Sequence, residues 1–272
     1  MAEMFGFDCY SPREIAARVE NVGVTKAGLP WLSQLALGVL AGAFIGLGAM
    51  FYTVVVSDPG LGFAAARVLG GLVFSLGLIL VVLAGAELFT GNNLLVMAWV
   101  SGRIPAGRLL GHLGLIYAAN LAGAAGLAAL VAWSGHGQMN GGAVGQAMMK
   151  LAAAKCALPF GEAFLKGVLC NLLVCLAVWV ALAGRTVTDK VLAIVFPITA
   201  FVACGYEHCV ANMYFIPLGW WLGAEGVTCA RFVANLVPVT LGNLVGGAGM
   251  VGLVYWVIYR RGAALEKPAG PA

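Results

Sequence analysis

A glutamate and a histidine, Glu207 and His208, stand side by side in otherwise apolar sequence. They belong to the stretch 205–212, which follows the pattern G-x-E-x-x-x-x-N, and the stretch 85–92 around Glu87 follows it too. Ionisable side chains are costly inside a membrane and usually mark a pathway there. Histidine can also take up and release a proton near neutral pH. The two stretches therefore predict one site built from both halves of the chain.

The composition predicts a polytopic membrane protein. Of the 272 residues, 62% are hydrophobic and 10% are charged, and the mean hydropathy is +0.97. A soluble domain has about 25% charged residues. The sequence lacks the segments of about ten residues with alternating apolar and polar side chains that are typical of membrane β-barrels, so helices should cross the bilayer. The net charge of +4 is small and scattered, which argues against a nucleic-acid partner.

The chain divides into a short N-terminal segment, a pore domain and a tail, at 1–29, 30–260 and 261–272. In the first segment, Ser11 to Glu14 form a capping box with Pro12 at the first helical position, so a surface helix is expected at 11–26. Six spans are expected at about 31–56, 61–83, 107–133, 160–183, 191–222 and 232–259. A Gly-rich loop, 134–146, should lead into a short helix that reaches Lys155, and 184–190 should be a polar connector.

The second and fifth spans are expected to be broken, because the two glutamate stretches interrupt them with glycine and polar residues. Unwound backbone at membrane depth is tolerated only inside protein or along a cavity. The third and sixth spans also share a pattern, at 120–123 and 243–246. The chain is therefore interpreted as two inverted three-helix repeats, at about 30–135 and 158–260, with a substrate pathway near the midplane.

Positive charge predicts that both termini lie in the cytoplasm, since cytoplasmic loops carry an excess of Lys and Arg. Ten of the 15 Lys and Arg residues fall on that side: Arg13, Arg18, Lys26, Arg103, Arg108, Arg185, Lys190, Arg260, Arg261 and Lys267.

The two glutamates have a structural interpretation beside a functional one. Glu87 and Glu207 could accept the backbone N–H groups that a helix break leaves free, or they could relay protons. His208 has no counterpart in the first half, where Leu88 takes its place, and this broken symmetry favours a pathway role. The Thr90 hydroxyl, in the first break, could donate to an anion or to His208.

Further polar candidates lie near these breaks. Asn171 and Asn243 are amides within spans, and helix packing explains them as well as substrate contact does. Asn212 ends the second motif. Lys155 precedes the fourth span on the outer side, where it could attract an anion or simply snorkel to the interface.

These motifs carry a family resemblance. Stretches 85–92, 170–179 and 205–212 resemble the formate/nitrite transporter family, and the likeness extends over about residues 10–260. Segments 184–190 and 237–259 are more similar to formate channels than to nitrite channels. The resemblance implies an aquaporin-like protomer, a homopentamer with one pore per protomer, and a location in the bacterial inner membrane. It implies transport of a small monovalent anion, formate first, with no cofactor and no enzymatic activity.

The resemblance also implies roles for residues along the pore. A central His208, with Thr90 close by, would aid protonation of the anion, and Lys155 would attract it from outside. Two hydrophobic constrictions would flank the histidine. The cytoplasmic one would comprise Leu78, Leu88 and Phe201, and the periplasmic one Phe74 and Val174. Two departures are Cys209, where formate channels often have Ser, and a loop around 223–231 that is shorter than in formate channels.

Other functions remain open at this point. Nitrite or hydrosulfide could be the substrate within the same family. A neutral-solute channel would be expected to have paired Asn-Pro-Ala boxes at its breaks, whereas this chain has Glu there. A haem- or quinone-binding subunit would need paired His ligands on facing spans. Only His112, His136 and His208 exist, and His136 is expected in a loop.

Overall fold

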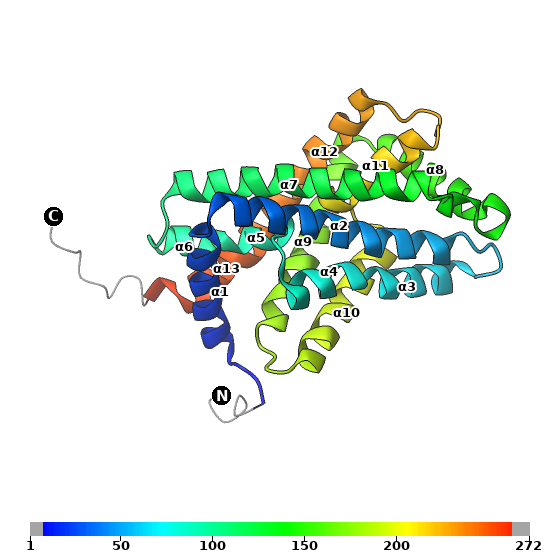
Figure 1. Ribbon diagram of the computed structural model, residues 1–272. Helices are drawn as coiled ribbons and strands as arrows, with labels where there is room; N and C mark the ends of the chain where they lie inside the picture. Colours follow the sequence, from blue (N-terminus) through cyan, green and yellow to red (C-terminus); the bar gives the residue numbers. More distant parts are fainter. Residues whose placement is uncertain (1–7, 263–272) are drawn as a thin grey trace.

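The computed structural model describes residues 8–262, and helices build nearly all of this part (Figure 1). The expected tail, 261–272, and the first seven residues lie almost wholly outside the described residues. The α-helices are α1 Pro12–Ala27, α2 Trp31–Val56, α3 Phe63–Phe74, α4 Leu76–Leu80, α5 Phe89–Asn92, α6 Val96–Val100, α7 Ala106–Trp133, α8 Ala143–Cys156, α9 Phe160–Ala181, α10 Val187–Ala203, α11 Cys209–Trp221, α12 Cys229–Leu244 and α13 Val254–Tyr259. Two π-helical stretches, Val81–Gly85 and Val245–Leu253, continue α4 and α12.

Local sequence signals explain where the helices begin. The capping box at Ser11 is present, and its hydrogen bonds to Glu14 lower the pKa of that carboxyl group. A second capping box, from Thr186 to Asp189, starts α10 within the segment expected to be a connector. The polar residues 187–190 therefore belong to the helix. In the same way α8 begins at Ala143, inside the expected Gly-rich loop. Thr228 caps α12, which begins at Cys229, three residues before the expected start.

Among residues 8–262, five helices are long and apolar enough to cross a membrane: Trp31–Val56, Phe63–Gly85, Ala106–Trp133, Phe160–Ala181 and Cys229–Tyr259. The fifth expected span, 191–222, consists instead of α10 and α11, with 17 and 13 residues. The helix α10 ends at Ala203, and the turn that follows it contains Gly205. In the first half, the π-helical stretch ends at Gly85. Both glycines have positive φ, +74° and +83°, which other residues rarely adopt.

Close helix packing joins the elements of each half. In the first half α2 lies against α7, where a Cβ atom at Gly42 would meet the Asn120 carbonyl and one at Gly123 would meet the Val39 carbonyl. In the second half α9 lies against α12, and a Cβ atom at Gly242 would meet the Phe164 carbonyl. Small residues therefore let the backbones touch, as in other membrane helix pairs.

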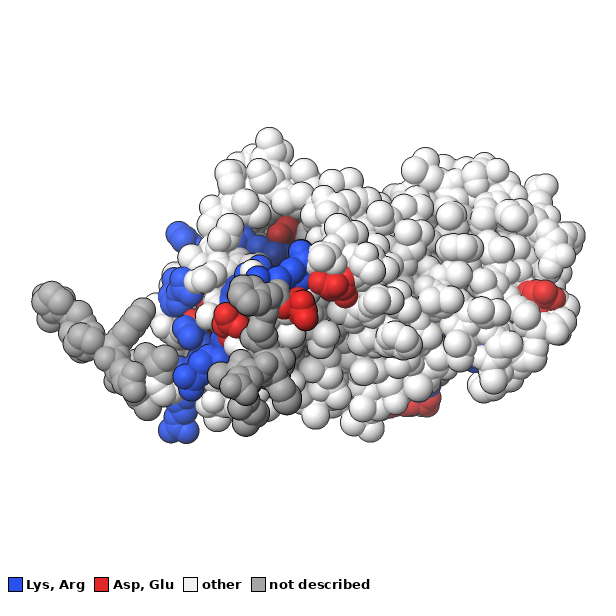
Figure 2. Space-filling view, turned by 90° about the horizontal axis from the view of Figure 1, so that it is seen from below, with Lys and Arg blue, Asp and Glu red and all other residues white. Residues whose placement is uncertain are grey.

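The visible face in Figure 2 has one charged end and a wide region with few charged side chains. Lys, Arg, Asp and Glu gather at that end. The helices α1 and α13 meet at that end, where Arg260 donates to the buried Glu20 carboxylate at 2.8 Å. Large apolar side chains such as Leu110, Leu130 and Phe196 are exposed on the described helices. This surface suits a lipid environment.

Candidate functional site: a histidine between two charged cavities

Three cavities follow one another through the protein. The Lys155 cavity has a volume of about 410 Å³, and the Lys26 cavity has about 480 Å³. A central cavity of about 10 Å³ lies between them. It shares Phe74, Phe201 and His208 with the Lys155 cavity and shares Leu78 and Leu88 with the Lys26 cavity. Apolar side chains thus close the route on both sides of the centre.

Phe201 lies between the two expected constrictions. It was expected beside Leu78 and Leu88, and it lines the central cavity with both of them. It also lines the Lys155 cavity and packs edge-on against Phe74, with ring centroids 5.7 Å apart. Of the three cavities, Val174 lines only the central one. The pairing of Phe201 depends on how α10 packs against α3, which the linear sequence does not reveal.

His208 is held at the start of α11 by two hydrogen bonds. Its Nδ1 atom accepts the Ala211 backbone N–H at 3.1 Å, so the ring caps the helix. Its Nε2 atom lies 2.9 Å from Thr90 Oγ1. Because Nδ1 is an acceptor, a neutral ring carries its proton on Nε2 and donates it to Thr90. The side chain is 2% exposed and faces the Phe201 ring.

Thr90 belongs to α5 rather than to the break itself. The non-helical residues are 86–88, and α5 begins at Phe89. The Thr90 carbonyl accepts from the Asn171 amide and from the Cys175 thiol, each at 3.3 Å. Asn171 lines none of the three cavities, so in this structure it supports the Thr90 backbone.

Two asparagines, not the glutamates, satisfy the backbone at the breaks. Asn120 accepts the Phe89 N–H at 2.9 Å and donates to the Glu87 carbonyl. Asn243 accepts the Cys209 N–H at 2.9 Å and donates to the Glu207 carbonyl, and it lines no cavity either. The expected role of the two carboxylates as acceptors for these N–H groups is therefore wrong.

Each glutamate instead completes a triad with a lysine and an asparagine. Glu207 accepts from Lys155 Nζ at 2.9 Å and from the Asn212 amide at 2.7 Å. Glu87 lies 3.1 Å from Lys26 Nζ and accepts from the Asn92 amide at 2.7 Å. An amide donor and an ammonium thus surround each largely buried carboxylate, and this pairing offsets the cost of burying its charge.

The two triads share a sequence pattern and a set of contacts. Lys26 begins the sequence K-A-G-L-P and Lys155 begins K-C-A-L-P, each directly before a long apolar helix. Asn235 accepts from the Asn212 amide at 2.7 Å, and His112 Nε2 lies 2.9 Å from the Asn92 amide. The sequence reasoning missed Lys26 as a partner, although the shared K-x-x-L-P pattern could have revealed it. The contacts of His112 and Asn235 had no comparable signal.

Metal binding has no support in the described part of the chain. Across residues 8–262, no group of three or more His, Cys, Asp and Glu side chains could hold a metal ion.

Cavities separated by apolar side chains follow one another around the buried His208, in a chain with long apolar helices. These features define a membrane transport protein. The sequence profile described as "Formate/nitrite transporter" matches residues 13–257, and the chain belongs to this family. The formate channel FocA of Escherichia coli (strain K12) is 39% identical over 274 residues, which cover 94% of this chain and 96% of FocA.

Solved structures support the same assignment. One described as a pentameric formate channel with formate bound has a TM-score of 0.79 and 37% identity, and the match covers 84% of this chain and 97% of that one. An aquaglyceroporin from Plasmodium falciparum has a TM-score of 0.51 at 16% identity, covering 84% and 98%. The second comparison shows a related fold and nothing about function.

Proposed function

We propose that this chain forms a homopentameric channel for a small monovalent weak-acid anion, with formate as the first candidate. The observation that carries the proposal is the buried His208–Thr90 pair beside a narrow, apolar-walled centre. The names of the relatives, a formate channel and a pentameric formate channel with formate bound, support the substrate and the assembly. Nitrite and hydrosulfide are the alternatives, since an apolar constriction does not separate small monovalent anions of similar size.

The proposed protomer has six spans arranged as two inverted repeats, with an aquaporin-like fold. The pair α10 and α11 forms the fifth span, and the non-helical residues 86–88 and 204–208 lie at membrane depth. The matching lysine–glutamate–asparagine triads support the repeat. The excess of Lys and Arg on one side supports cytoplasmic termini in the bacterial inner membrane. The Lys26 cavity then faces the cytoplasm, and the Lys155 cavity faces outward.

The energetic problem for such a channel is the apolar centre. An unpaired carboxylate loses its water there, which is prohibitively costly. Protonating the carboxylate of an acid whose pKa is near that of Asp, about 3.9, requires roughly 4 kcal/mol at pH 7, at 1.36 kcal/mol per pH unit. Passage as a neutral acid is therefore the cheaper route past Phe74 and Leu88.

His208 and Thr90 would supply that proton. Protonation of Nδ1 requires the ring to release the Ala211 N–H, and it produces an imidazolium. The Nε2 proton then moves to Thr90 Oγ1 while the hydroxyl proton moves to the carboxylate. The products are a neutral ring and a neutral acid, so charge and protons balance. A proton from solvent restores the imidazolium for the next anion.

Flux into liposomes containing the purified protein tests this function. Formate, nitrite and hydrosulfide would be compared at about pH 7.5 and about pH 5.5, on either side of the ordinary histidine pKa. The proposal expects formate to be fastest, with a rate that changes between the two pH values. Faster nitrite or hydrosulfide would overturn the substrate, and no flux of any of the three would overturn the channel.

A further inference from the structure

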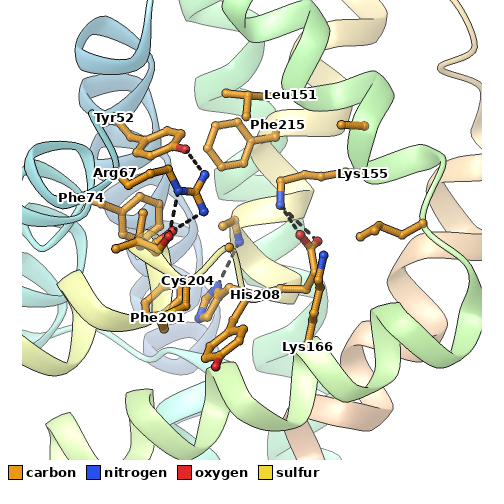
Figure 3. Close-up of a pocket in the computed structure, with 18 of the residues that line it drawn as sticks. Tyr52, Arg67, Phe74, Leu151, Lys155, Lys166, Phe201, Cys204, His208 and Phe215 are labelled. Atoms are coloured by element: carbon orange, nitrogen blue, oxygen red, sulfur yellow. Dashed lines mark hydrogen bonds and ion pairs between the residues drawn. The ribbon is translucent and has the colours of Figure 1, made fainter. Parts of the chain in front are cut away.

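Arg67, on α3, reaches the Lys155 cavity from the side opposite Lys155 (Figure 3). Its Nε atom donates to the Ala203 carbonyl at 2.8 Å, Nη1 to the Tyr52 hydroxyl at 3.1 Å, and Nη2 to the Val202 carbonyl at 2.9 Å. A guanidinium has five N–H groups. Within residues 8–262, one N–H on each terminal nitrogen is therefore left without a protein acceptor.

The charges around this cavity leave Arg67 as its available cation. Three cations line the cavity, and Glu207 is the carboxylate that lines it. Lys155 is paired with Glu207 at 2.9 Å, and Lys166 is paired with Glu162 at 2.6 Å. No carboxylate of residues 8–262 comes within 4.0 Å of the Arg67 nitrogens. The cavity therefore carries a positive charge that a monoanion can neutralise.

We propose that Arg67 is the anion-binding residue of the Lys155 cavity. Its two free N–H groups hold a small carboxylate or similar monoanion before the anion reaches His208. The inference rests on the proposed function, because it names the entry site of that same pathway. It assigns to Arg67 the attraction of the anion that the sequence predicted for Lys155, whose ammonium is already paired.

Arg67 is also oriented for this task by the end of α10. The carbonyls of Val202 and Ala203 end that helix, and a cation is favourable at a helix C-terminus. These bonds fix the plane of the guanidinium before a ligand arrives, so little ordering is needed on binding. Gly205 leaves the space required, since a Cβ atom there would lie 2.7 Å from Arg67 Nη2.

Weak binding suits a conduction pathway, because an ion must leave its site as readily as it enters. Two charge-assisted N–H groups recognise a carboxylate, and the open cavity keeps the affinity low. A point charge such as Lys155 would attract an anion without orienting it. Arg67 therefore has the geometry for selecting planar, monovalent anions at the mouth of the pathway.

Substitution of Arg67→Gln tests the site. The rate of formate uptake into vesicles would be measured at a series of formate concentrations. Formate would be supplied first at the Lys155-cavity face of the channel and then at the opposite face. The half-saturating concentration at the Lys155-cavity face should rise about tenfold or more, the effect of losing the charge-assisted hydrogen bonds to the anion, while the maximal rate is retained. Arg231→Gln is the matched control, because Arg231 is exposed, lies at the same end and does not line the cavity. A lower maximal rate with an unchanged half-saturating concentration would overturn the proposal. Arg67 would then only donate to the carbonyls at the end of α10.

A second measurement uses the unaltered protein and does not depend on transport. Phenylglyoxal modifies accessible arginines, and mass spectrometry gives the rate at each site. Formate should slow modification of Arg67 and leave that of Arg231 unchanged, even if the flux experiment overturned the channel. Equal rates at Arg67 with and without formate would contradict the binding site, including in the case where the Gln variant fails to assemble.

Discussion

At the scale of single residues, the sequence revealed isolated polar side chains but not the partners that the fold brings to them. His208 and Thr90 could be selected because each is polar in an apolar run, and the structure brings them to 2.9 Å. Lys26 and Arg67 were not selected, because their roles depend on which carbonyl or carboxylate the fold brings near. Asn171 and Asn243 were selected, yet both bind backbone atoms behind the site.

The Lys155–Glu207 pair should contribute more to stability than its counterpart in the first half. The Glu207→Gln substitution leaves the Lys155 ammonium unpaired, and this side chain is only 14% exposed. Breaking such a buried pair costs about 3 kcal/mol. We expect a clear fall in the melting temperature of the detergent-solubilised protein, measured by its intrinsic tryptophan fluorescence.

Glu87→Gln is the matched comparison, because it removes the same carboxylate from the other triad. Lys26 is 26% exposed, so water can solvate its ammonium once the partner is gone. The fall in melting temperature should be smaller than for Glu207→Gln. Equal or reversed effects would show that burial does not set the importance of these two pairs.

At the scale of elements, long apolar segments located the long helices well. Polar segments were wrongly expected to be connectors where they in fact begin helices. The expected bounds of α2 and α7 agree with the structure to within one residue. Residues 184–190 were expected to be a connector because most of them are polar, yet Asp189 caps the helix that contains it. The π-helical stretch of Val245–Leu253 has no sequence signal comparable to a cap.

Helix contact in α7 gives a prediction with an internal control. A Cβ atom at Gly123 would collide with the Val39 carbonyl of α2, whereas one at Gly126 would meet nothing within 4 Å. Gly123→Ala should destabilise the protein by about 1–3 kcal/mol, as overpacking does. Gly126→Ala should leave the melting temperature unchanged or raise it slightly, since alanine favours the helix. A melting temperature that falls equally in both variants would exclude the contact as the cause.

At the scale of the whole molecule, the two halves meet where their symmetry is broken. Both halves have the same triad and the same asparagine behind the break, but Leu88 in one half stands opposite His208 in the other. The pairing of motifs between the halves was visible in the sequence as G-x-E and N-L-x-G patterns. The grouping of Phe201 with Phe74 was not, because it depends on how α10 lies against α3.

This asymmetry leads to the central claim, that His208 supplies the proton with which an anion crosses the apolar centre. The most direct measurement is formate flux through His208→Asn in liposomes, at about pH 7.5 and about pH 5.5. Asparagine keeps a polar side chain but cannot carry a proton, so the flux should fall about 100-fold or more, the usual contribution of a positioned acid, and its pH dependence should disappear. Full flux with unchanged pH dependence in this variant would contradict the claim.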